Sequence, residues 1–113
     1  MQGILISEVS GTGTLVTRQA ARTLYASMEG QLPQKGTEVQ FDFSNLQALT
    51  PSFLDELITI LGERFRKYHA VQPQVMLANL PERLSVPLVT IGRAHRLEVV
   101  QKPPGTWRLQ WPR

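Results

Sequence analysis

The chain has 113 residues, of which 42% are hydrophobic and 19% charged, which suits one folded domain over residues 1–113 and excludes a disordered chain. It contains no cysteine, so disulfides and thiolate metal sites are excluded. No apolar run approaches the roughly 18 residues that span a membrane, and the N-terminus lacks the basic and apolar regions of a signal peptide. We therefore expect a cytoplasmic protein without a bound cofactor or metal.

The net charge of +3 is unevenly distributed along the chain. Residues 1–61 contain three basic and six acidic side chains, whereas residues 62–113 contain nine basic and three acidic ones. Such asymmetry can mark a surface for an anionic partner. The two halves of a single domain intermix, so we favour an ordinary solvated surface.

The N-terminal part predicts a strand over 3–9, a turn over 10–14 and a first helix that begins near Thr17, a good N-cap. The Gly-Thr-Gly of the turn lacks the lysine and the spacing of a phosphate-binding loop. Gly30 can close the helix, and 31–36 is expected to be a loop. Helical spacing is shown by Ala20, Ala21, Leu24, Tyr25 and Met28.

Two further strands are expected in the middle of the chain. Residues 37–43 alternate, with Val39, Phe41 and Phe43 on one face, which predicts one covered and one more polar face. Residues 74–80 are almost continuously apolar, which is typical of a central strand buried on both faces. We expect 39–43 to lie beside 75–79.

The C-terminal part predicts a short turn after Pro81 and a helix over about 87–95, because Pro87 forbids one unbroken helix. Strands are expected over 97–101 and 106–111, and the latter should be an edge strand that buries Trp107, Leu109 and Trp111 on one face. The whole order predicts an α/β fold: a mostly parallel or mixed sheet of four to five strands, about three helices and a C-terminal antiparallel strand.

The second helix, over about 50–69, has a strong core stripe. On a helical wheel the following residues lie within about 50° of one direction: Leu54, Leu57, Ile58, Leu61, Phe65 and Tyr68. Pro51 suits the first helical position, which makes Thr50 the N-cap. The alternative is Ser52 as N-cap in a capping box with Asp55.

Ser52 lies about 160° from the centre of the stripe, so its hydroxyl should face solvent near the positive end of the helix. Asp55 and Glu56 benefit from the same field, but they would repel a phosphate on Ser52. Composition and spacing alone favour the plainer interpretation, in which Thr50, Ser52, Asp55 and Glu56 only start a helix. Phe53 and Ile60 flank Arg64 and form either the edge of the core or a small exposed apolar strip.

The run "VQFDFSNLQALTPSFLDEL" (39–57) resembles the signature of the STAS-like domains of unknown function, a family of short prokaryotic domains. The segments 15–24, with Arg18, and 76–80 also resemble this family, and the resemblance covers roughly 4–95. The residues that carry the signature are Phe41, Asp42, Phe43, Ser52, Phe53, Asp55, Glu56 and Leu57.

These domains are similar to the STAS domains of anti-sigma factor antagonists, in which a partner kinase phosphorylates a serine at the start of this helix. The resemblance implies Ser52 as that serine, although Thr50-Pro51-Ser52-Phe53 replaces the antagonists' Asp-Ser-Ser/Thr-Gly. It also implies a non-enzymatic regulatory or adaptor domain whose partner is a histidine-kinase-like ATPase or another signalling protein. The expected partner surface comprises Ser52, Phe53, Asp55, Glu56 and Ile60.

Nucleic-acid binding by the basic C-terminal part is the alternative function, although the charge is modest and no recognised module is visible. Its residues would be Arg93, His95, Arg96, Lys102 and Arg108, with Trp107 or Trp111 as stacking groups. An enzyme is not expected. His69 and His95 are the only histidines, and neither has the Ser and Asp neighbours of a catalytic triad.

Overall fold

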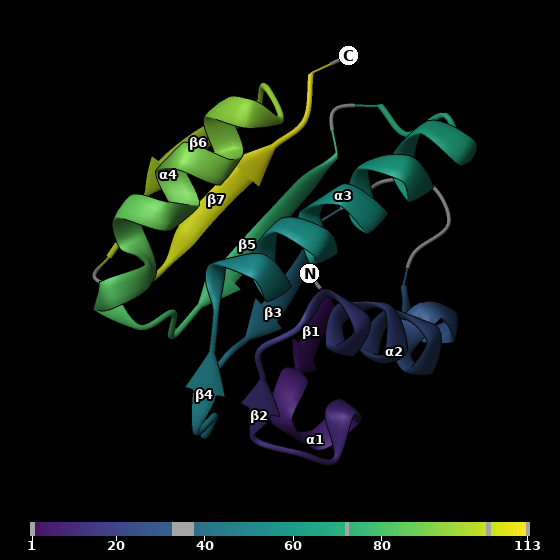
Figure 1. Cartoon of the computed structure of the whole chain (residues 1–113). Helices are drawn as coiled ribbons and strands as arrows, with labels where there is room; N and C mark the ends of the chain where they lie inside the picture. The colour runs from purple at the N-terminus through teal and green to yellow at the C-terminus, as the bar shows by residue number, and fades with distance from the viewer. Residues whose placement is uncertain (1, 33–37, 72, 104, 113) are drawn as a thin grey trace.

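A five-stranded sheet with the strand order β1-β3-β5-β7-β6 forms the centre of the fold (Figure 1). The computed structural model describes residues 2–32, 38–71, 73–103 and 105–112. The strands of the sheet are β1 (Gln2–Leu5), β3 (Glu38–Asp42), β5 (Gln74–Ala78), β6 (Glu98–Gln101) and β7 (Trp107–Gln110). A separate parallel pair is formed by β2 (Thr14–Leu15) and β4 (Ala48–Leu49).

The described residues form four α-helices and two short 3-10 helices. The α-helices are α1 (Ile6–Ser10), α2 (Arg18–Met28), α3 (Pro51–Lys67) and α4 (Ser85–Ala94), and the 3-10 helices are η1 (Glu29–Gln31) and η2 (Glu82–Leu84). This small α/β domain with a mixed five-stranded sheet confirms the fold class predicted from the sequence. None of the described helices is long and apolar enough to cross a bilayer.

The strand order explains why the helices lie on one face of the sheet. β1, β3 and β5 are parallel neighbours, while β7 is antiparallel to both β5 and β6, so β6 runs in the same direction as β5. The three helical crossovers therefore all move the same way across the sheet. Because such crossovers are right-handed, α2, α3 and α4 must cover the same face, as Figure 1 shows.

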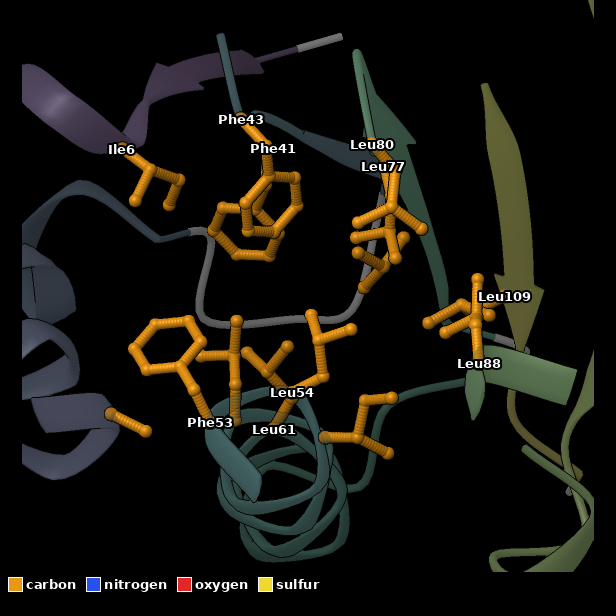
Figure 2. Close-up of a cluster of buried hydrophobic side chains, with 14 of the residues drawn as sticks. Ile6, Phe41, Phe43, Phe53, Leu54, Leu61, Leu77, Leu80, Leu88 and Leu109 are labelled. Atoms are coloured by element: carbon orange, nitrogen blue, oxygen red, sulfur yellow. The ribbon is translucent and has the colours of Figure 1, made fainter. Parts of the chain in front are cut away.

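The core lies between this face and the helices. In the close-up of Figure 2, Phe41 and Leu77 of the sheet point toward Phe53, Leu54 and Leu61 of α3. All five side chains are at most 2% exposed. The register confirms that 39–43 lies beside 75–79, with Val39 opposite Val75 and Phe41 opposite Leu77.

The expectation that residues 74–80 are buried on both faces is wrong. In β5 only Val75 and Leu77 are buried, while Met76 and its register partners Gln40 and Arg108 are half-exposed. The second face has no helix above it among the described residues. The apolar residues Met76 and Ala78 therefore lie on the uncovered face of the sheet, while Val75 and Leu77 belong to the core.

The first strand is shorter than expected, because the chain turns into α1 at Ile6. A strand continued over 3–9 would point Ile6 and Val9 to opposite faces, and only one face is covered. In α1 both side chains pack on the core, and Gly11, with a φ of 69°, ends the helix. Gly30 does not close α2 but lies within η1. Residues 33–36 of the expected loop lie outside the described residues.

The C-terminal strand is not an edge strand, since β7 lies between β5 and β6. Trp107 and Leu109 are buried as expected, whereas Trp111 is half-buried against Phe65, with ring centroids 5.0 Å apart. The preceding helix begins at Ser85 rather than 87. Pro87 falls in its first turn, where the missing N–H has no intrahelical acceptor to lose.

Candidate functional site

Thr50 begins α3, as one of the two alternatives predicts. Its Oγ1 accepts a hydrogen bond from the Phe53 N–H at 3.3 Å, and Pro51 occupies the first helical turn. The same Oγ1 donates to the Val16 carbonyl at 2.9 Å, and the Thr50 N–H donates to the Leu15 carbonyl at 3.3 Å. Thr50 therefore fixes the start of α3 to the segment that leads into α2.

Ser52 is exposed in the first turn of α3, as the wheel predicts. Its hydroxyl has no hydrogen-bond partner among the residues that the structure describes. The 17-residue α3 presents the positive end of its dipole here. Ser52 is thus a free hydroxyl in a field that favours negative charge.

Phe53 does not belong to an exposed strip, because its side chain is fully buried. The wheel considers one helix alone, whereas in the fold α2 packs beside α3 and covers that flank. Arg64, on the same flank, is 6% exposed and donates to the Tyr25 hydroxyl at 3.1 Å and the Leu32 carbonyl at 3.3 Å. Ile60 remains half-buried. Phe53 is therefore removed from the partner surface, and its alternative role at the edge of the core is confirmed.

Asp55 and Glu56 are not presented freely to solvent, contrary to expectation. Asp55 accepts from Arg18 Nη1 at 2.7 Å with Oδ2 and contacts His95 Nε2 at 2.8 Å with Oδ1. Glu56 contacts Arg18 Nη1 at 3.4 Å and Arg22 Nη1 at 3.1 Å. We call these five residues the helix-end cluster. It joins the start of α2, the second turn of α3 and the residue that ends α4.

The electrostatics of the helix-end cluster favour the ionised carboxylate of Asp55. Partial burial raises the pKa of this group, but the hydrogen bonds from His95 and Arg18 together outweigh it and hold the pKa below 3.8. The hydrogen bond to Asp55 also raises the pKa of Arg18. The Arg18 guanidinium therefore compensates the charge of Asp55, and Arg22 contacts the carboxylate of Glu56 in the same second turn of α3.

Asp42, the acid of the strand motif, organises the ends of β3 and β5. Its Oδ1 accepts from the Asn79 side chain and from the Ser44 N–H, each at 2.9 Å. The bond from Asn79, followed by that from Ser44, lowers its pKa below 3.8. Asn79 has a positive φ of 58°, and the bond to Asp42 ties this turn to the neighbouring strand. Asp42 thus makes hydrogen bonds within the fold, and its two carboxylate oxygens are not both available to a ligand.

Sequence reasoning missed that His95 and Arg22 belong with the acids of α3. His95 was expected in the basic C-terminal part and Arg22 was not singled out. The spacing of Arg18 and Arg22 by four residues on one helix face was the available signal. This spacing does not show which helix packs against that face, so the pairing of the two arginines with Asp55 and Glu56 could not be predicted.

The residues expected for nucleic-acid binding are not gathered into one free surface. Trp107 is buried, His95 contacts Asp55, and Arg108 donates to Glu98 at 2.8 Å. Arg93, Arg96 and Lys102 remain exposed. The described residues also include no group of three or more His, Asp or Glu side chains placed to hold a metal ion.

Comparison with known families finds a match to a family model. Residues 20–74 match the sequence model of the family described as a STAS-like domain of unknown function. The stretch includes Asp42, Ser52, Asp55 and Glu56, whereas Arg18 lies just outside it. The predicted resemblance is confirmed here, over a shorter range than 4–95. No match was found among curated proteins or among solved structures.

Proposed function

We propose that this protein, whose residues 20–74 match the STAS-like domain family, is a non-enzymatic regulatory module that binds a signalling protein through the surface around Ser52. The observation that carries the proposal is the free Ser52 hydroxyl at the N-terminal end of a long helix. Backbone N–H groups and the dipole at such an end favour a bound or attached phosphate. Phosphorylation of Ser52 would then switch binding.

The helix-end cluster supports this proposal by changing the electrostatics that a phosphate would meet. Free carboxylates on Asp55 and Glu56 would repel a phosphoserine one turn away. Both are paired with basic side chains, so their charge is largely compensated. The objection to a phosphate at Ser52 is correspondingly weaker.

The cluster also gives Asp55 and Glu56 a different role from direct contact. By holding α2, α3 and the end of α4 together, these acids position the turn that carries Ser52. The partner surface then consists of exposed Pro51 and Ser52 and, farther along α3, half-buried Ile60. The partner class, a histidine-kinase-like ATPase, follows from the relation of this family to anti-sigma factor antagonists.

The test is direct binding to a purified histidine-kinase-like ATPase of the host, measured with and without ATP. We expect ATP to add one phosphate to the wild type and none to Ser52→Ala, with Ser27→Ala, an exposed serine on α2, as the matched control. Ser52→Glu should weaken binding at an unchanged melting temperature, because exposed positions change stability by only about ±0.5 kcal/mol. Equal binding by Ser52→Glu and wild type, with no phosphate on Ser52, would refute the switch.

A further inference from the structure

The outer edge of β6 has backbone groups that are free to pair with another strand. Among the described residues, β6 is the last strand of the sheet and pairs with β7 alone. The Lys102 N–H donates to the Thr106 carbonyl at 2.9 Å, so Lys102 and Thr106 form a hydrogen-bonded pair. Because such pairs alternate along an antiparallel ladder, Val100 and Arg108 form the next one. Val99 and Gln101 are then the residues whose N–H and C=O point away from β7. An exposed strand edge of this kind is a template for an added strand.

An apolar groove runs beside the same edge. The volume of this open groove is about 350 Å³. The groove is lined by Ser85, Val86, Val89, Thr90, Arg93 and Trp107. Gly92 lies against Val99 of β6, and Leu88 faces the core, so Val86, Val89 and Arg93 lie on the flank of α4 away from α3. Val86 is 77% exposed, which is unusual for a large apolar side chain beside a groove.

Three basic side chains lie near this edge, and the one acid of β6, Glu98, is paired with Arg108 at 2.8 Å. Arg93, Arg96 and Lys102 are exposed, and no carboxylate among the described residues forms an ion pair with them. Trp107 is the register partner of Gln101, so the apolar part of the groove lies at the Gln101 end of β6 and the arginines lie toward its start. The charge is complementary to an acidic occupant. In a second copy paired edge to edge, these like charges would meet.

We propose that this edge site, formed by β6 with Val86, Val89, Arg93 and Trp107, takes an extended acidic segment of a partner protein as an added strand. On the side facing α4, the segment places an apolar side chain in the groove and a carboxylate two residues away beside Arg93. Side chains two residues apart share one face of a strand, which matches this arrangement. The proposal is independent of Ser52, which lies on a different helix.

The probe is a synthetic eight-residue peptide with Thr at the odd positions and Val and Glu alternating at the even positions. Its control has Lys in place of Glu. We expect the Glu peptide to bind, to protect the Val99 and Gln101 amides from hydrogen exchange, and to bind more weakly as salt rises. The Lys peptide should not bind.

Three variants locate the site. Gln101→Pro removes an N–H that points away from β7, so the sheet is retained while the added strand loses its bond. Val86→Glu places a charge in the apolar groove, and Arg93→Glu reverses the charge beside it. Gln101→Pro, Val86→Glu and Arg93→Glu should each weaken binding about tenfold or more. Val71→Glu, at a valine 70% exposed, and Arg66→Glu, at an exposed arginine of α3, are the matched controls and should bind normally.

Four results would overturn the proposal. The first is absence of binding by the Glu peptide, and the second is equal binding by the two peptides. The third is wild-type affinity in both Gln101→Pro and Val86→Glu. The fourth is a dimer that Gln101→Pro dissociates, which would assign the edge to a second copy instead. Melting curves of all variants identify any loss of binding that comes from unfolding.

Discussion

Thr50 connects two parts of the fold, and its replacement by alanine measures both connections. Its hydroxyl accepts from the Phe53 N–H and donates to the Val16 carbonyl. Loss of an N-cap costs about 1 kcal/mol, and loss of a second hydrogen bond about 1 kcal/mol more. Thr50 is half-exposed, so water replaces part of both bonds. We expect Thr50→Ala to lower the free energy of unfolding by about 1.5–2 kcal/mol.

Thr17→Ala is the matched control. Thr17 caps α2 by accepting from the Ala20 N–H at 3.0 Å, but it makes no second bond to a distant segment among the described residues. It should cost only about 1 kcal/mol. Thr50→Ser keeps the hydroxyl and should cost less than either alanine variant.

The measurement is urea unfolding of the three variants and wild type, followed by the fluorescence of the two tryptophans. The dependence of the free energy on urea should be unchanged, because the same surface is exposed on unfolding. If Thr50→Ala costs no more than Thr17→Ala, the bond to Val16 contributes nothing and the connecting role of Thr50 is refuted. A cost below about 0.5 kcal/mol would also remove its role as a cap.

Three further predictions follow from the helix-end cluster, Asp42 and β7. The double variant Asp55→Lys/Glu56→Lys should lower the melting temperature by several degrees, because it replaces four attractive contacts with repulsion; an unchanged melting temperature would show that the pairs contribute nothing. The pKa of Asp42 is lowered from 3.8, so its contribution to stability is present at neutral pH and is lost as pH falls below about 4. The difference in unfolding free energy between wild type and Asp42→Ala should therefore shrink in acid, and a constant difference from pH 7 to 3 would contradict this. Deletion of 104–113 removes β7 from the interior of the sheet and leaves β6 without a partner, so the truncated chain should show no cooperative unfolding; a melting curve like that of the intact chain would refute this.

The sequence by itself determined the local structure. Thr50, Pro51 and the six-residue core stripe predicted where α3 begins and which side faces the sheet, because capping and helical periodicity depend on near neighbours. The alternation in residues 39–43 likewise predicted β3 and its covered face. The exposed position of Ser52 followed from the same wheel. These features require no knowledge of what lies beside the element.

Only the tertiary structure decided what lies beside each element. Phe53 is buried because α2 packs on its flank, and Asp55 and Glu56 are paired because Arg18, Arg22 and His95 are brought within reach from other helices. The strand order also decided that β7 is internal and that β5 has one uncovered face. A period of 3.6 or 2 residues fixes the direction in which a side chain points. Whether that side chain then meets solvent, the core or an ion partner depends on segments tens of residues away in the chain. Local patterns in the sequence do not identify those segments.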